Sequence, residues 1–237
     1  ISHEIRTPLN TILGYSELLL LEDKIEKETL KANGTEIYQA STDLLELINN
    51  ILDVSRIESG NEKANYDEYK LETLIFEVNS KITPRVAKIG NTSFRLNIDE
   101  NLPSTYFGDI QKVQRIVLSL LYNAIEYTSF GEIVLDISGT TIDNETELQF
   151  LVSNTGHAMK EEFFNITFDD VAAIDATKAI NSNVLGIIIS KSLAKILGGE
   201  IIFKNEINQG TKYFFKVKQR NITNDTLGNI YEKIENL

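Results

Sequence analysis

Apolar residues recur at three- and four-residue steps through the first 58 residues, which is the spacing of one face of an α-helix. Within residues 1–22 the members of this stripe are Ile5, Leu9, Ile12, Leu13, Leu19 and Leu20. Within residues 27–58 they are Ile37, Leu44, Leu45, Ile48, Ile51 and Leu52. The charged stretch 23–28 indicates a turn, and Gly60 is a typical helix C-cap. The sequence therefore predicts two long helices joined by a short turn.

Two helices alone cannot bury so wide an apolar face, so these leucines need a further surface. The common solution is a four-helix bundle built from two copies of the hairpin. We therefore predict an all-α first domain over residues 1–62 that forms a homodimer. The alternative is a hairpin that packs on the rest of its own chain.

The composition narrows the class of protein. A chain of 237 residues is long enough for two modest domains, and 42% hydrophobic with 24% charged residues is typical of globular proteins. The formal charge of -12 argues against a nucleic-acid surface, which needs clustered lysine and arginine. The absence of cysteine excludes disulfides and thiolate metal sites, and no apolar run reaches the roughly 18 residues of a membrane helix. Because the chain begins inside a motif without an initiator methionine, we expect a fragment of a longer protein.

Beyond a polar linker at residues 61–65, strand and helix patterns alternate. Period-two alternation predicts strands at 66–69, 92–98, 131–138, 147–153, 200–205 and 211–219. Helical spacing predicts helices at 71–88 and 184–197 and a third that Asp109 caps. This order predicts an α+β sandwich over residues 63–219, with helices on a single face of one sheet. Residues 220–237 are expected to form a polar tail or linker.

The segment SHEIRTPLN, residues 2–10, carries one of the chain's two histidines in a setting suited to accept a phosphoryl group. The neutral imidazole of His3 has a nucleophilic nitrogen, and Glu4 beside it can take the proton from the other ring nitrogen. Pro8 has no N–H for the carbonyl of Glu4, so we expect a helix to bend just after His3. Thr7, one turn beyond His3, is a candidate to hold a water for hydrolysis. The plain alternative is an amphipathic helix start with a solvated histidine.

This segment resembles the phosphoacceptor box of sensor histidine kinases, the two-component signalling enzymes of bacteria, and the resemblance continues to about residue 218. It implies catalytic roles for His3, Glu4 and Thr7, and a second domain of the ATP-binding type shared with gyrase and heat-shock chaperones. It also implies ATP and Mg²⁺ as cofactors and a response-regulator receiver domain as partner. By the same resemblance we expect the cytoplasmic portion of a protein anchored in the bacterial inner membrane through regions upstream of this sequence.

Residues 109–128 resemble the asparagine-bearing helix of that ATP-binding domain. The resemblance places Asn123 at the Mg²⁺ position, and an amide oxygen is a suitable hard ligand for magnesium. It assigns Tyr127 to the same nucleotide site. Ser119 stands where the family commonly has a second asparagine, and Glu126 stands where it usually has a lysine facing the phosphates. The reversed charge could cost roughly 2 to 5 kcal/mol of binding in a partly desolvated site, unless the side chain points away.

Two further boxes depart from the family pattern. Residues 154–158 replace Asp-x-Gly-x-Gly by Asn154-Thr155-Gly156-His157-Ala158, in which Asn154 can still accept a hydrogen bond from adenine and Gly156 is retained. Residues 181–189 keep only Leu185 and Gly186 of the glycine-rich phosphate box, with a stiff Val184 where a glycine is expected. Lys178 is the remaining candidate cation for a phosphate contact.

Two hypotheses follow from an intact acceptor box and a substituted nucleotide site. In the first, the chain is a kinase that autophosphorylates His3 from ATP and passes the phosphoryl group to a response-regulator aspartate. In the second, it is a relay, phosphatase or regulator-docking module that binds ATP poorly or not at all. A purely structural coiled coil would leave the acceptor box unexplained.

Overall fold

The computed structural model describes residues 2–21, 26–159, 182–206, 210–231 and 234 of the chain. The chain divides into two compact units, and the boundary after the helical hairpin falls between Asn61 and Glu62. Each unit is described by itself. None of the described helices is both long enough and apolar enough to cross a bilayer.

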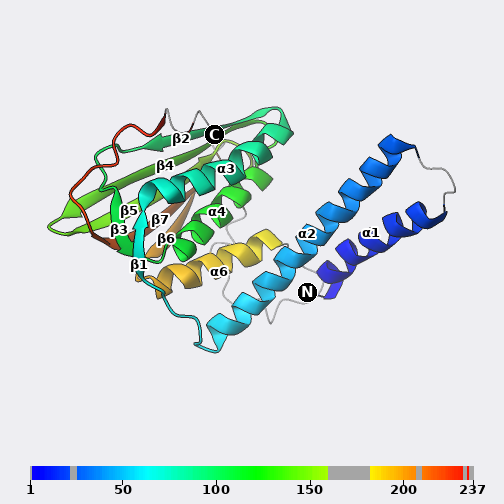
Figure 1. Ribbon diagram of the computed structural model, residues 1–237, viewed down its shortest axis with the longest axis horizontal. Coiled ribbons are helices and arrows are strands. Elements are labelled where there is room, and N and C mark those ends of the chain that lie inside the picture. Colours follow the sequence, from blue (N-terminus) through cyan, green and yellow to red (C-terminus); the bar gives the residue numbers. More distant parts are fainter. Residues whose placement is uncertain (1, 22–25, 160–181, 207–209, 232–233, 235–237) are drawn as a thin grey trace. The chain divides into compact units, whose positions relative to one another are not determined.

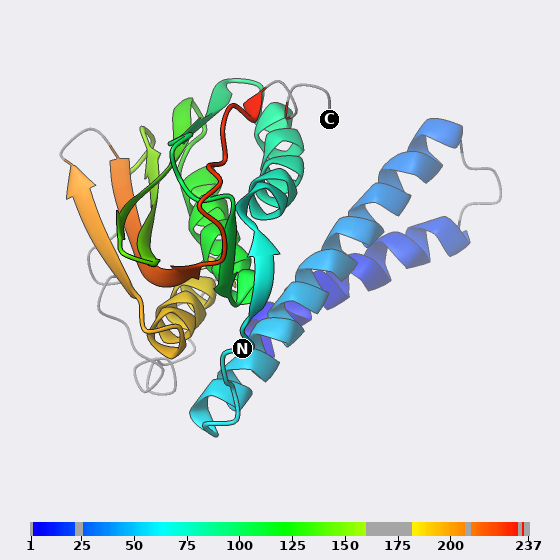
Figure 2. The same ribbon diagram turned by 60° about the vertical axis from the view of Figure 1, so that its left-hand side comes forward.

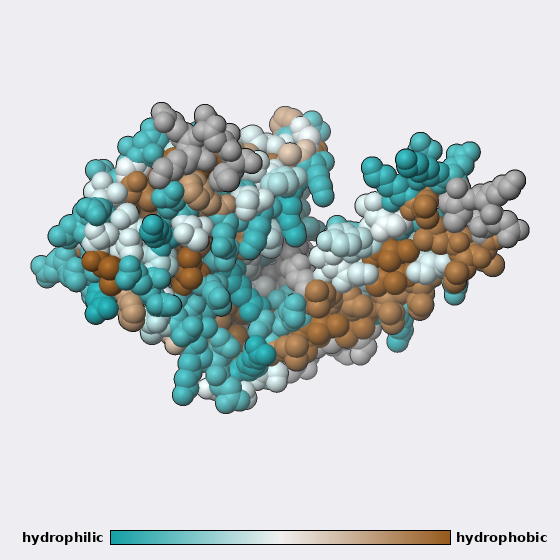
Figure 3. Space-filling view, viewed as in Figure 1, coloured by the Kyte–Doolittle hydropathy of each residue, from teal (hydrophilic) through white to brown (hydrophobic). Residues whose placement is uncertain are grey.

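The first unit contains the predicted hairpin of two helices, α1 (Ser2–Leu21) and α2 (Lys27–Glu58), which pack against each other. Helix α1 continues through Pro8. Much of the apolar stripe remains exposed after the two helices have packed, and brown apolar side chains run along the hairpin (Figure 3). The exposed large apolar residues of the hairpin, within the stripe and beside it, are Leu9, Leu13, Leu18, Leu20, Leu21, Leu30, Tyr38, Leu45, Ile48 and Leu52.

The second unit holds a seven-stranded mixed sheet with helices on one face (Figures 1 and 2). The sequence predicted one sheet with helices on a single face, and six of these strands. Its elements in chain order are β1 (Asp67–Lys70), α3 (Leu71–Ile89), β2 (Thr92–Ile98), β3 (Thr105–Gly108), α4 (Ile110–Glu126), β4 (Gly131–Ile142), β5 (Glu145–Asn154), α6 (Ser182–Ile196, of which the part from Ile187 lies in this unit), β6 (Glu200–Glu206) and β7 (Gly210–Asn221).

The sheet has the strand order β1-β3-β7-β5-β4-β2, with β6 paired to one end of β7. Only β2 and β4 run parallel; the other described pairs are antiparallel. Alternate residues of each strand point toward the helices, which is why Phe150 of β5 stacks on Phe215 of β7 with ring centroids 5.7 Å apart. Val113, Ile116 and Leu120 of α4 are fully buried, so this helix closes the core from its amphipathic face.

Strand β3 was not predicted from the sequence. It has four residues, Thr105–Gly108, and it follows Pro103 closely. A period-two pattern needs more than four residues to be recognised. The strand forms because it pairs with β1 and β7, which a local sequence pattern does not reveal.

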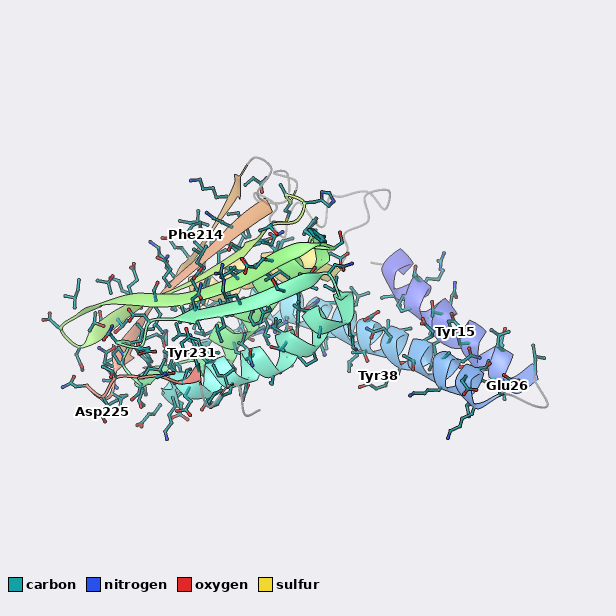
Figure 4. The ribbon with its side chains drawn as sticks, turned by 90° about the horizontal axis from the view of Figure 1, so that it is seen from above. Tyr15, Glu26, Tyr38, Phe214, Asp225 and Tyr231 are labelled. Atoms are coloured by element: carbon teal, nitrogen blue, oxygen red, sulfur yellow. The ribbon has the colours of Figure 1, made fainter. Side chains whose placement is uncertain are left out.

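The sequence assigned residues 220–237 to a separate tail, and the structure corrects this as far as Tyr231. Strand β7 continues to Asn221, and the following segment runs back along residues 98–105. The N–H of Ser104 donates to the carbonyl of Asp225 at 2.8 Å, and the N–H of Ile98 donates to the hydroxyl of Tyr231 at 2.9 Å (Figure 4). Ile230 is 1% exposed. Burial of this apolar side chain helps to hold the segment, whose composition is otherwise polar, against the domain.

Candidate functional site

The acceptor segment forms the beginning of α1. Ser2, His3 and Glu4 are helical in backbone, and their side chains lie outside the described part of the structure. Thr7 is exposed, and its carbonyl accepts a hydrogen bond from the Thr11 hydroxyl at 3.1 Å. Thr7 comes four positions after His3, so the two positions lie on the same side of a continuous helix.

Helix α4 presents Asn123 from its buried face. Asp109 caps the helix, because its side chain accepts a hydrogen bond from the N–H of Lys112 at 3.0 Å. Asn123 is 1% exposed, and its Nδ2 donates to the carbonyl of Ser119 at 2.9 Å. This bond fixes which way the amide faces and directs the oxygen Oδ1, the atom suited to Mg²⁺, away from Ser119.

Tyr127 and Gly156 meet at the end of α4. The N–H of Tyr127 donates to the carbonyl of Asn123 at 3.2 Å, and the N–H of His157 donates to the carbonyl of Tyr127 at 2.8 Å. A Cβ added to Gly156 would overlap the carbonyl oxygen of Tyr127 and would lie 2.7 Å from the Cα of Thr128. Only glycine allows the loop after β5 to lie this close to the helix. Burial, and after it the neighbouring Glu126 carboxylate, raises the pKa of the Tyr127 phenol.

Asn154, at the end of β5, has both polar side-chain atoms in hydrogen bonds. Its Nδ2 donates to the Thr128 hydroxyl at 3.0 Å, and its Oδ1 accepts from the N–H of Thr211 at 3.2 Å. The Thr128 hydroxyl in turn donates to the carbonyl of Ala124 at 2.7 Å. Asn154 is 2% exposed, so this network is buried and each bond in it orients the next.

A hollow of about 460 Å³ opens beside this network. It is lined by Ser129, Phe130, Thr155, Gly156, His157, Ala158 and Gly210. Its volume lies within the range of small-molecule sites, and its walls combine an aromatic ring with hydroxyl groups and backbone. The hollow therefore has the size and the mixed polar and apolar lining of a site for a small molecule.

The structure thus brings four of the predicted nucleotide residues together, namely Asn123, Tyr127, Asn154 and Gly156. Leu185 is buried and Gly186 is half-buried near the start of α6. Lys178 lies outside the described residues.

The substituted positions differ in their surroundings. Glu126 and Ala158 are exposed, so neither disturbs the core of the unit. Val184 is helical and 1% exposed, and among the described residues Asp143 is the only non-glycine with positive φ. Val184 is therefore not strained by its backbone conformation.

Thr128 and Thr211 are site residues that the sequence analysis missed. Thr211 holds Asn154 through its N–H, and its hydroxyl accepts from the N–H of Met159 at 2.9 Å and donates to Asn205 at 3.0 Å. The available signal was a threonine directly after Gly210, at a buried position of β7 where the alternation calls for an apolar side chain.

Comparison with protein families matches two parts of the chain. Residues 1–60 match the family described as "His Kinase A (phospho-acceptor) domain". Residues 108–221 match the family described as "Histidine kinase-, DNA gyrase B-, and HSP90-like ATPase". The second match ends at the last residue of β7.

Two relatives align with nearly the whole chain. Hybrid signal transduction histidine kinase B of Dictyostelium discoideum is 31% identical over 223 residues, which are 92% of this chain and 11% of that protein. Signal transduction histidine-protein kinase BarA of Escherichia coli (strain K12) is 27% identical over 225 residues, which are 91% of this chain and 24% of that protein. The chain thus spans a quarter or less of the length of these relatives.

Two solved structures share the fold. Full-length ShkA, in complex with AMPPNP, has a TM-score of 0.65 at 24% identity and covers 94% of this chain and 45% of its own. The histidine kinase AdeS of Acinetobacter baumannii has a TM-score of 0.60 at 18% identity and covers 93% of this chain and 98% of its own. At these identities the likeness shows the fold alone.

Proposed function

We propose that this chain, which belongs to the sensor histidine kinases, phosphorylates its own His3 from ATP and then passes the phosphoryl group to an aspartate of a response-regulator receiver domain. The observation that carries the proposal is the presence, in one chain, of both an acceptor region and an ATPase-type region. The proposed domain limits are residues 1–61 for the acceptor hairpin and residues 62–231 for the nucleotide domain, tail segment included.

The transfer to His3 needs a nucleophile, a base and a leaving group. One imidazole nitrogen of His3 attacks the γ-phosphorus while the bond to the β,γ-bridging oxygen breaks and ADP leaves. The carboxylate of Glu4 takes the proton from the other ring nitrogen, which keeps the imidazole neutral as the new N–P bond forms. In the second step a receiver carboxylate attacks the same phosphorus and His3 recovers its proton.

The residues around α4 would hold the nucleotide. Asn154 and the backbone at Gly156 would face the base, with Tyr127 beside them, as their contacts around the end of α4 suggest. Asn123 would supply an amide oxygen to the Mg²⁺ that accompanies ATP, and the metal would neutralise phosphate charge in the transfer. Leu185 and Gly186 are proposed to face the phosphates, because the start of a helix favours anions. Lys178 is proposed to add a positive charge to this contact.

The hairpin is proposed to dimerise through its exposed apolar residues. Leu45 is 59% exposed and Leu13 is 52% exposed, although both belong to helices that are already packed against each other. A second hairpin would remove this surface from water. The same bundle would present Thr7 and His3 to the receiver domain, and Thr7 would position the water that hydrolyses a phosphoryl group on the receiver.

The test is to incubate the chain with ATP labelled in the γ-phosphate and Mg²⁺, and to locate the label by mass spectrometry. The chain has two histidines, so the label must be assigned to His3 or to His157. We expect label on His3 and none in His3→Ala. Label on His157, or label that persists in His3→Ala, would refute the acceptor assignment.

A second candidate function is a relay or phosphatase that binds ATP weakly. The observation that favours it is the network of Asn154, since adenine would have to share an amide whose two polar atoms already have partners. Calorimetric titration of Mg²⁺ and ATP into the chain separates the candidates. Absence of heat at millimolar nucleotide, with retained phosphatase activity that Thr7→Ala abolishes, would select the relay.

A further inference from the structure

The end of helix α2 is closed by a well-defined C-cap. The N–H of Asn61 donates to the carbonyl of Arg56 and the N–H of Gly60 donates to the carbonyl of Ile57, both at 3.0 Å. Gly60 has φ of +67°, as this motif requires of the residue after the cap. The backbone of the hairpin is therefore held in place as far as the N–H of Asn61.

The next residues are held by the other unit. The Lys112 ammonium lies 2.8 Å from Oε1 of Glu62 and 3.0 Å from Oδ2 of Asp109, and that same Oδ2 accepts the N–H of Asn65 at 2.9 Å. The side chains of Glu62, Lys112 and Asp109 are 24%, 13% and 3% exposed. We call these three side chains the linker clamp. Because its members are largely shielded from water, they attract each other more strongly than surface ion pairs do.

The charges in the linker clamp support one another. Burial alone raises the pKa of the Asp109 carboxyl, but hydrogen bonds from Asn65 and Lys112 and the Lys112 ammonium outweigh it, so the pKa lies below its ordinary value. Burial alone lowers the pKa of Lys112, and its bonds to Glu62 and Asp109 reverse this. The Asp109 carboxylate and the Lys112 ammonium are therefore both ionised at neutral pH.

We propose that Lys112 and Asp109 are positioning residues, which tie the linker from Glu62 to Asn65 onto the first turn of α4 and confine the pivot between the two units to the junction of Asn61 and Glu62. This inference rests on the proposed function, because the pivot matters when bound ATP must reach His3. Helix α4 carries the clamp at its first turn and Asn123 farther along. The linker is thus attached directly to the helix that is proposed to hold the metal.

A short pivot limits the arc that the nucleotide domain searches. The effective concentration of one tethered group near another falls as the tether lengthens, and transfer requires a narrow set of orientations. If the clamp opens, the free tether grows from one junction to the four residues 62–65 and the segment beyond. The rate of transfer to His3 then falls, while the binding of ATP within the nucleotide domain does not change.

Limited trypsin digestion of the full chain measures how often the linker clamp opens. Lys63 lies within the clamped linker and is exposed, so cleavage after it reports opening of the surrounding backbone. In Lys112→Met we expect cleavage at this bond to accelerate about tenfold, the factor expected on losing about 1.4 kcal/mol from partly buried charge pairs. Lys112→Arg should restore slow cleavage, and Lys81→Met, a change at an exposed lysine of α3, should leave it unaltered.

The kinetic readout uses the same variants with γ-labelled ATP. We expect Lys112→Met to lower kcat for His3 labelling about threefold to tenfold with KM for ATP unchanged, since the nucleotide is bound by other residues. Glu62→Gln leaves the pair of Lys112 and Asp109, and with it the cap of α4, in place. It should lower kcat in the same direction by less, which separates a loosened pivot from a damaged helix.

Cleavage at Lys63 that does not accelerate in Lys112→Met would overturn the clamp. So would a normal kcat in Lys112→Met and Glu62→Gln despite faster cleavage, or a rise in KM equal to the fall in kcat. Failure of the proposed function looks different: the unaltered chain would bind no ATP and take no label, and the tie between linker and α4 would then be decided by the cleavage rates alone.

Discussion

Replacing Asn154 by aspartate restores the family residue, yet we expect it to destabilise the nucleotide-free domain. The reason lies in Thr128. Its hydroxyl has one proton, which it donates to the carbonyl of Ala124 at 2.7 Å, so it meets the Nδ2 of Asn154 with a lone pair at 3.0 Å. A carboxylate oxygen in place of Nδ2 sets two acceptors against each other at a site that is 2% exposed.

The size of the effect follows from two terms. The lost hydrogen bond is worth about 1 kcal/mol, and a buried charged acceptor without its donor costs about 1 to 3 kcal/mol more. The bond from the Thr211 N–H remains and strengthens with the charge, so about 2 kcal/mol or somewhat more is the net expectation. For a domain of this size that lowers Tm by about 4 to 8 °C.

The assay is thermal unfolding of both proteins between pH 4 and pH 8, with and without Mg²⁺ and ATP. Unfavourable burial raises the folded-state pKa of the introduced carboxyl above its unfolded value of about 3.9. The loss of unfolding free energy in Asn154→Asp is therefore full at a pH above the folded-state pKa of the carboxyl. It shrinks as the pH falls toward the unfolded-state pKa, because the protonated carboxyl can donate a hydrogen bond to Thr128. With ATP the order should reverse, because the charged acceptor binds the adenine amino group more strongly.

A matched control is Asn91→Asp, at an exposed position, for which we expect a change in Tm within about 1 °C. An Asn154→Asp variant at least as stable as the original at pH 7 without nucleotide would refute the described network. A deficit that persists unchanged at pH 4 would show that charge burial is not its cause.

Three further outcomes are expected. Gly156→Ala should lower Tm by about 2 to 10 °C and abolish ATP binding in a calorimetric titration, because its Cβ meets backbone of Tyr127 that cannot yield; an unchanged affinity would contradict the close approach. Leu45→Glu should reduce the mass of the chain in light scattering to that of a monomer, since it places a charge in the exposed stripe; an unchanged dimer would move the interface elsewhere. The lowered pKa of Asp109 contributes stability that is full above about pH 4 and is lost as the pH falls through the pKa of this carboxyl in the folded protein. The unfolding free energy of Asp109→Asn should therefore vary less with pH below about pH 4 than that of the original chain; an equal dependence on pH in both proteins would contradict that contribution.

Residues with strong periodic or capping signals could be placed from the sequence alone. The stripe that contains Leu45 and Ile48 predicted the hairpin, and Asp109 marked the start of α4. Strand β3 and the anchored segment up to Tyr231 were out of reach, because both depend on partners distant in the chain, such as Ser104 with Asp225. Local sequence carries no record of such pairings.

The site shows the same division between local and distant information. Asn123, Tyr127 and Gly156 follow from motifs that are continuous in sequence, and the structure brings them together. Thr128 lies just after α4 and Thr211 lies on β7, and their roles come from hydrogen bonds to Asn154 that form only in the fold. Lys112 belongs to this second group: in sequence it is one charged residue on a helix, and only its distances to Glu62 and Asp109 give it a role.

The substitutions in the nucleotide boxes separate the stability of the fold from its affinity for ATP. Asn154 is satisfied without a ligand, while Glu126 and Ala158 face solvent. None of these three positions therefore needs nucleotide to complete its contacts. A domain selected only for its fold would tolerate all three residues, whereas a domain that depends on ATP must recover the lost charge and close approach elsewhere. The affinity for ATP, and not the stability of the domain, is thus the quantity on which the two candidate functions differ.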